Sequence, residues 1–204
     1  MSEGMPETRA EDRLFYVWID VEATGLTEHD SLIEFGVIGT TEDLRVLFEF
    51  ETLAAPTPEA MGLLAANPVV SEMHRVNGLT PAIEEGLAAG TLPTIAEAEQ
   101  LILDQIKKHP RRVGGKLLLA GSGVWHSDRN ALARHTPRLA KLFADRDIVD
   151  GGIFRQFYRR IVGHNLVPAN DQKDHRALGD IRLHLEEMQA FANVFLEHAA
   201  RNRT

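Results

Sequence analysis

Apolar and polar positions change their period along the chain, and each period predicts a type of element. Runs of β-branched, aromatic and aliphatic residues predict strands at 15–21, 32–40 and 44–52. The short polar turn between the last two runs favours an antiparallel meander. From about residue 58 the apolar positions recur at helical spacing, and this texture continues to about residue 110.

The second half of the chain alternates between short apolar runs and helical segments. Two further strands are predicted at 116–121 and 146–150, with helices after each. The segment 163–174 is rich in turn formers and is expected to be a loop. A final helix is predicted over about 175–200, with an apolar stripe that should pack on the sheet: Leu178, Ile181, Leu185, Met188, Phe191 and Phe195.

This order of elements predicts an α/β fold, a mixed five-stranded sheet flanked by helices. Residues 1–12 are expected to be a flexible polar leader, and residues 13–204 a single domain.

The composition says little about the class of protein, but it excludes several kinds of catalytic and metal site. Hydrophobic residues make up 44% of the chain and charged residues 25%, as in an ordinary soluble protein. The chain has no cysteine, which excludes disulfides, thiolate nucleophiles and iron-sulfur clusters, so any metal must be held by oxygen and imidazole. No apolar run approaches the ~18 residues of a membrane span, and the polar start is unlike a signal peptide, so a cytoplasmic protein without a membrane partner is expected. The net charge of −8 argues against gripping long nucleic acid through many phosphates, but not against a small anion held by metal ions.

Two acids at the end of the first strand are the first candidates for a functional site. Asp20 and Glu22 are one residue apart, so on a strand both side chains point to the same face. Two carboxylates this close repel unless a cation lies between them. The similar pair Glu49 and Glu51 alternates with aromatic residues and is interpreted as a solvated strand face.

Three residues far along the chain complete this pattern. Asp128 follows a buried strand, although it or Ser127 would also serve as a helix cap. His175 lies near the start of the last helix, where the alternative is a surface residue, and Asp180 lies within that helix. Four carboxylates would form a hard-oxygen site for two Mg²⁺ or Mn²⁺ ions, the framework of two-metal phosphodiester cleavage, with His175 as general base. Activity should then rise with pH as the imidazole loses its proton.

The motifs resemble a known family. In order they are WIDVEATGL, MHRVNGL, AGSGVWHSD, TPRLAKLF with RDIVD, and HRALGDI, and they cover about residues 15–185. Together they resemble the DEDDh 3′→5′ exonucleases of ribonuclease-H-like fold, and within them oligoribonuclease. The resemblance implies a homodimer that releases nucleoside 5′-monophosphates. It also implies metal ligands and a general base at the positions already singled out: Asp20, Glu22, Asp128, Asp180 and His175.

The resemblance also suggests substrate contacts. Leu26 matches a leucine that wedges against a base, and His74 matches a substrate-side histidine; the alternatives are a core leucine and a helix-surface histidine. Thr24, Ser122 and Trp125 lie within the same motifs and are further candidates for substrate binding.

The chain departs from the family where the substrate is selected. Oligoribonucleases carry a base-stacking tryptophan where this chain has Val69 and Val70. The motif before Asp128 has one extra residue and a displaced serine. Gly151 and Gly152 stand where the family has the serine and threonine that cap the terminal phosphate, so that cap is expected to be absent.

Three functions remain open at this point. The first is 3′→5′ hydrolysis of short single-stranded oligoribonucleotides. The second is the same chemistry on single-stranded DNA or longer RNA ends, with phosphate contacts from one of two basic groups, Arg111, Arg112 and Lys116 or Arg155, Arg159 and Arg160. The third is a non-catalytic nucleic-acid-binding relative, which the presence of all five motif residues disfavours.

Overall fold

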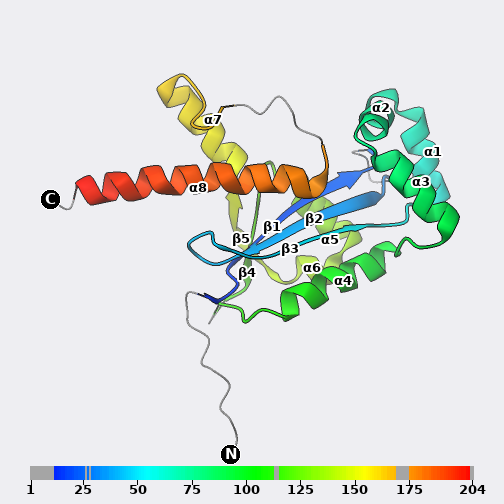
Figure 1. Ribbon diagram of the computed structural model, residues 1–204, viewed down its shortest axis with the longest axis horizontal. Coiled ribbons are helices and arrows are strands. Elements are labelled where there is room, and N and C mark those ends of the chain that lie inside the picture. Colours follow the sequence, from blue (N-terminus) through cyan, green and yellow to red (C-terminus); the bar gives the residue numbers. More distant parts are fainter. Residues whose placement is uncertain (1–11, 26, 28, 113–114, 169–174, 203–204) are drawn as a thin grey trace, which may run out of the picture.

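A mixed five-stranded sheet occupies the centre of the described structure, a computed structural model that describes residues 12–25, 27, 29–112, 115–168 and 175–202. The strand order is β3-β2-β1-β4-β5 (Figure 1). Strands β1, β2 and β3 form an antiparallel meander, and β4 and β5 run parallel to β1. The strands are β1 (Tyr16–Ala23), β2 (Leu32–Thr40), β3 (Val46–Leu53), β4 (Leu117–Gly121) and β5 (Phe143–Asp150). The predicted mixed sheet and its antiparallel meander are confirmed.

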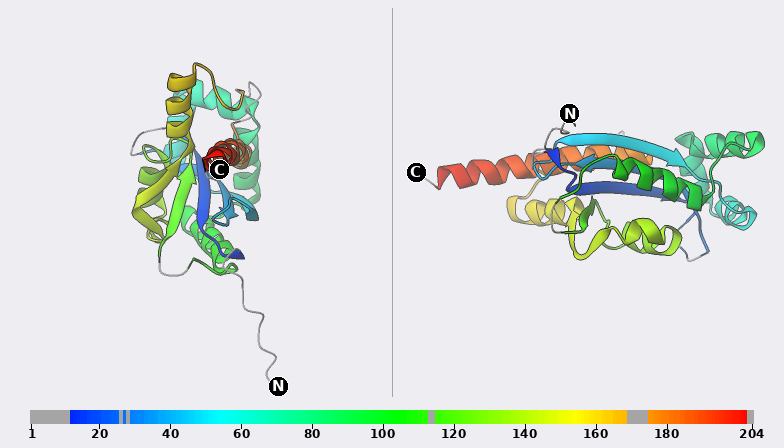
Figure 2. Two further views of the ribbon diagram at one scale, coloured as in Figure 1. Left: turned by 90° about the vertical axis from the view of Figure 1, so that its left-hand side faces the viewer. Right: turned by 90° about the horizontal axis from the view of Figure 1, so that it is seen from below.

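Helices cover both faces of this sheet. Helix α8 (Ala177–Arg201) lies across one face, and its apolar stripe packs against Trp18 and Ile38 (Figure 1). The opposite face packs on three helices (Figure 2). They are α4 (Ile95–Lys107), α5 (Asp128–His135) and α6 (Pro137–Ala140).

The predicted stripe on the last helix is wrong at one position. Phe195 is 55% exposed, whereas the other five stripe residues are buried. The C-terminal half of α8 extends beyond the sheet (Figure 1), so Phe195 has no strand to pack on and contacts Phe154 of α7 (Gly151–Val162) instead.

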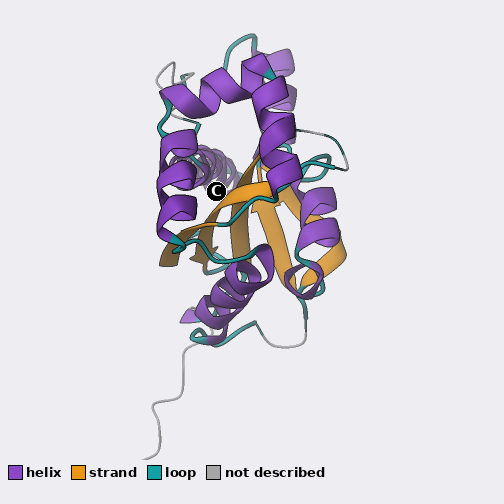
Figure 3. Cartoon of the chain, turned by 90° about the vertical axis from the view of Figure 1, so that its right-hand side faces the viewer, coloured by secondary structure: helices purple, strands orange, loops and turns teal. Residues whose placement is uncertain are grey.

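A group of three helices lies beyond the end of the sheet toward which β1 points (Figure 3). They are α1 (Pro58–Ala66), α2 (Pro68–Val76) and α3 (Leu79–Ala89). Prolines begin α1 and α2, and the side chains of Thr57 and Asn67 cap their first turns. These helices therefore form one wall at the carboxyl end of β1.

Parts of two predicted segments lie outside the described residues. They are residues 1–11 of the expected leader and residues 169–174 of the expected loop. Among the described helices, none has the length and apolar composition that crossing a membrane requires.

Candidate active site

The alternation of side chains along β1 creates the acidic end of the site. Trp18 is fully buried under α8, and its indole nitrogen donates to the Thr40 hydroxyl at 3.0 Å. Positions two and four residues later share this face, so Asp20 and Glu22 also point toward the α8 side. The burial that anchors Trp18 thus orients both acids.

A third acid reaches the pair from the first turn of α8. One oxygen each of Asp20, Glu22 and Asp180 lies within 4.8 Å of the others. Clustered carboxylate oxygens are the ligands that Mg²⁺ and Mn²⁺ prefer, so this donor set fits a divalent metal.

The raised pKa of Glu22 reflects the crowding of acids at this end of β1. Burial, followed by repulsion from Asp20, Glu34, Asp180 and Asp128, raises the pKa of Glu22 to about 9. A divalent cation would remove this penalty because it stabilises the ionised form. The electrostatics therefore agree with the donor chemistry.

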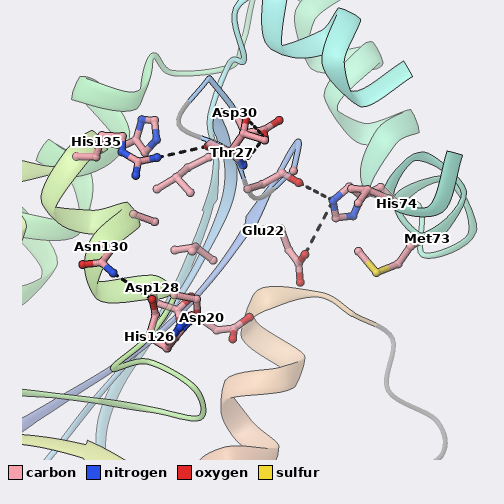
Figure 4. Close-up of a pocket in the computed structure, with 18 of the residues that line it drawn as sticks. Asp20, Glu22, Thr27, Asp30, Met73, His74, His126, Asp128, Asn130 and His135 are labelled. Atoms are coloured by element: carbon pink, nitrogen blue, oxygen red, sulfur yellow. Dashed lines mark hydrogen bonds and ion pairs between the residues drawn. The ribbon is translucent and has the colours of Figure 1, made fainter. Parts of the chain in front are cut away.

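Asp128 lies at the start of α5 and lines the same cavity of about 630 Å³ as Asp20 and Glu22 (Figure 4). Among the described residues it is not part of the 4.8 Å cluster. Burial raises the pKa of its carboxyl to about 6, although a hydrogen bond from Ser127 opposes this. Ser127 makes no side-chain cap of α5, since its hydroxyl donates to the Gly123 carbonyl and to Asp128. The structure thus brings three predicted acids together and places the fourth on the adjoining wall.

His175 stands two residues before α8, as the spacing to Asp180 requires. Its Nδ1 lies 3.9 Å from an oxygen of Asp180, and its side chain is 51% exposed. Its backbone has φ +51°, a left-handed conformation that is rare for a residue with a side chain. The imidazole is thus beside the acids and open to solvent.

The comparison with known families agrees with this geometry. A family model described as "Exonuclease" matches residues 17–188. The chain belongs to this exonuclease family.

The oligoribonuclease of Cutibacterium acnes is 33% identical over 185 residues, which are 88% of this chain and 85% of that protein. The oligoribonuclease of Streptomyces griseus is 36% identical and covers 86% and 83% of the two chains. The mitochondrial oligoribonuclease of Mus musculus is 31% identical and covers 87% and 71%. The protein is therefore an oligoribonuclease-like 3′→5′ exonuclease.

Solved structures share the fold of this exonuclease at low identity. A zinc-bound complex of E. coli exonuclease I with single-stranded DNA aligns with a TM-score of 0.57 and 14% identity, over 90% of this chain and 43% of that chain. Exonuclease I from Methylocaldum szegediense aligns with a TM-score of 0.57 and 16% identity, over 86% and 39%. This chain spans only about two fifths of those longer chains. The likeness establishes the ribonuclease-H-like α/β fold alone.

His74 of the exonuclease lies in the wall formed by α2. Its ring is fully buried and lines the cavity, so the alternative of a helix-surface residue is wrong, while its contact with substrate stays a prediction. Its Nε2 donates to the Ala23 carbonyl at 2.9 Å and lies 4.0 Å from a Glu22 oxygen (Figure 4). Burial lowers the pKa of His74, which favours the neutral ring. His74 thus supports the end of β1 from the side of the cavity.

The turn after β1 is built around a buried acid that the sequence pattern did not single out. Asp30 accepts hydrogen bonds from the Thr24 hydroxyl at 2.8 Å and from the Thr27 amide at 2.7 Å. Burial acts to raise the pKa of Asp30, but the hydrogen bonds from Thr27 and Thr24 outweigh it and lower the pKa. Gly25 is required here because a Cβ would meet the Asp30 carboxylate at 2.7 Å. Thr24 is therefore buried beneath the turn, while Leu26 lies outside the described residues.

The two remaining substrate candidates lie on the loop after β4. Ser122 lines the cavity. Trp125 is half exposed and is not among the residues that line the cavity; the Arg129 guanidinium lies 5.2 Å from its ring centre. Both roles in binding stay predictions.

The basic residues described in the cavity lining belong to neither of the two groups of cations named from the sequence. The described lining includes His126, Asn130 and Arg134, which recur every four residues at and along α5. That spacing was visible in the sequence. Among the described lining residues none of the six expected cations occurs, and Arg155 forms a bidentate pair with Glu187 instead.

Proposed function

We propose that this exonuclease removes nucleotides from the 3′ ends of short oligoribonucleotides and releases nucleoside 5′-monophosphates. The observation that carries the proposal is the convergence of Asp20, Glu22 and Asp180, with His175 beside them. The relatives that match most of the chain are oligoribonucleases, which supports short RNA as the substrate class.

The acids and the histidine would have separate roles. Asp20, Glu22, Asp180 and Asp128 would hold two Mg²⁺ or Mn²⁺ ions, which supply charge stabilisation for the attacked phosphodiester. With Nδ1 of His175 facing Asp180, its Nε2 would accept the proton of the attacking water. Because the imidazole is half exposed, this proton can pass to solvent.

The walls of the cavity favour a smaller preference for dinucleotides over other short RNA. Val69 is 77% exposed and Val70 lines the cavity, so no aromatic ring stacks on a base from these two positions. Stacking is worth roughly 1–3 kcal/mol per base. Without it, dinucleotides should lose part of their advantage in binding over longer RNA. Asp150 also accepts from the amides of Gly123 and Gly152 at 2.9 Å, so its carboxylate already uses two amides that a terminal phosphate could otherwise accept from. We therefore propose hydrolysis that does not depend on a 5′-phosphate.

The test is product analysis on RNA and DNA ladders of about two to twenty nucleotides, with and without 5′-phosphate, in Mg²⁺ or Mn²⁺. We expect 5′-monophosphate products, faster cleavage of short RNA, and rates that change less than about threefold on removal of the 5′-phosphate. Asp20→Asn should abolish cleavage, and Glu51→Gln, an exposed acid on β3, should not. A flat length dependence or a preference for DNA would favour the single-stranded DNA or longer-RNA alternative. Absence of hydrolysis with every substrate would favour a binding protein.

The assembly we propose is a homodimer of domains spanning residues 13–204, acting in the cytoplasm. An apolar surface on α7 and the end of α8 supports the dimer. We call it the α7–α8 face, and its exposed members are Ile153, Phe154, Phe157, Ile161, Val162, Val194, Phe195 and Leu196. Phe157 and Ile161 are 69% and 71% exposed, and the ring contact between Phe154 and Phe195 joins the two helices into one surface. A second copy of the chain would bury this face.

A further inference from the structure

Strand β2 carries a buried acid, Glu34, that lies beside the acidic site and binds the start of α8. Glu34 pairs with Glu22 across β1 and β2, so both side chains lie on the α8 face, and Glu34 is only 1% exposed. Its Oε1 accepts from Nε and Nη2 of Arg176 at 2.8 and 2.6 Å. Its Oε2 accepts from the backbone amide of Ala177 at 3.0 Å. One carboxylate therefore binds the two residues that follow His175.

The next residue on this face allows the helix to approach the strand. A Cβ on Gly36 would lie 2.5 Å from the backbone nitrogen of Leu178. The start of α8 is thus seated directly on β2, with Glu34 and Gly36 beneath it.

The other side of the junction is held by the end of α2. Asn77 Nδ2 donates to the backbone carbonyl of His175 at 2.6 Å, and Asn77 Oδ1 accepts from the Leu79 amide at 3.0 Å. His175 has the left-handed conformation between these contacts. Such a conformation is unfavourable for a non-glycine residue and persists only where the surroundings determine it.

We propose that Glu34, Arg176 and Asn77 form a clamp that positions His175 for proton transfer. This inference rests on the proposed role of His175 as general base. The three are positioning residues, because their contacts reach the backbone around His175. Loosening the clamp lets the junction leave the left-handed conformation, which moves the imidazole away from Asp180. The chemical step then slows, while the acids and the substrate walls are unchanged.

The sharpest variant is Asn77→Asp, which is nearly isosteric. It retains the acceptor for the Leu79 amide and loses the donor to His175. Val76→Asp places the same charge on the adjacent, exposed position of α2 and is the matched control. Arg176→Lys retains the charge but loses the two-nitrogen contact with Glu34.

We expect kcat of Asn77→Asp and Arg176→Lys to fall roughly 10- to 100-fold, with KM and calorimetric Mn²⁺ affinity within about threefold of the wild type. Val76→Asp should match the wild type. In a His175→Ala background, neither clamp variant should lower kcat further, because the group that the clamp positions is gone.

The outcomes separate this inference from the proposed function. Wild-type kcat in Asn77→Asp, or losses that multiply with His175→Ala, would refute the clamp and leave the general base in place. Wild-type kcat in His175→Ala alone would refute the general base, and the clamp with it.

Discussion

At the scale of single residues, the site gathers carboxyl groups that repel one another. The pKa of Glu22 is raised to about 9 by burial and by neighbouring acids, and that of Asp128 to about 6 mainly by burial. Both groups therefore bind protons more tightly in the folded than in the unfolded chain. Their contribution to stability is fully present at acidic pH and is lost as pH rises through these values.

Glu22→Gln should stabilise the metal-free protein at neutral and alkaline pH. The wild-type Tm should fall as pH rises from about 5 to 9, and the variant should fall less. If the penalty is about 2 kcal/mol, the variant gains about 4–8 °C at pH 8. Thermal unfolding with EDTA across this pH range measures it.

Mn²⁺ should raise the wild-type Tm and have little effect on Glu22→Gln, because the variant lacks one ligand. Glu51→Gln is the control and should follow the wild type. A variant less stable than the wild type at pH 8 would contradict the assignment of this electrostatic penalty to Glu22.

His175→Ala should lower kcat roughly 10²- to 10⁴-fold, since the attacking water loses its proton acceptor. The dependence of wild-type kcat on pH should also change, because the acceptor of the water's proton is gone. Rate measurements from pH 5 to 9 test both effects. His198→Ala, at the exposed end of α8, should retain the wild-type profile, and persistence of that profile in His175→Ala would exclude the histidine from proton transfer.

At the scale of elements, the arrangement of the acidic site depends on how closely one helix approaches one strand. Helix α8 carries Asp180 in its first turn, and its start is seated on β2 at Gly36. Strand β1 supplies Asp20 and Glu22 from the neighbouring position in the sheet. The separation of the three acids is therefore set by the contact between α8 and β2.

Gly36→Ala should lower stability and activity together. The added methyl group overlaps the backbone of α8, and overpacking of this kind costs about 1–3 kcal/mol. The helix start can relieve the overlap only by moving away from β2, so kcat and Mn²⁺ affinity should both fall. Chemical denaturation, calorimetry and kinetics measure these effects.

Gly62→Ala on α1 is the control, because a Cβ there meets nothing within 4 Å. That variant should keep full activity and gain about 0.5–1 kcal/mol from helix propensity. Full activity in Gly36→Ala would mean that the close approach of α8 does not set the geometry of the site.

At the scale of the whole molecule, the proposed catalytic and assembly surfaces occupy different parts of α8. Its first turn faces the acids, whereas its C-terminal half extends past the sheet and joins α7 in the α7–α8 face (Figure 1). One helix thus links the proposed dimer contact to the proposed catalytic site.

Phe157→Glu should convert the proposed dimer to a monomer, because it places a charge at the centre of the α7 stripe. Light scattering after size-exclusion chromatography measures the mass. Val76→Glu adds the same charge to an exposed apolar position on α2 and should leave the dimer intact. A wild-type protein that is monomeric at micromolar concentration would contradict the assembly.

The sequence by itself determined the order of elements, the antiparallel meander and the pair of acids on one face of β1. These features depend on local periodicity, which can be recognised from the residues of one segment without knowing how the segments pack. The resemblance of the motifs then indicated which distant residues belong with Asp20 and Glu22, and the structure brings Asp180 and His175 beside them.

Only the tertiary structure decided which side chains meet across long separations. Glu34 reads as one acid in an apolar strand until Arg176 is placed beside it. His74 and Asn77 read as helix residues, yet one is buried against β1 and the other binds His175. Phe195 continues a regular stripe but lies past the end of the sheet. Periodicity shows which way a side chain points along its own element, whereas its partner depends on how the elements pack.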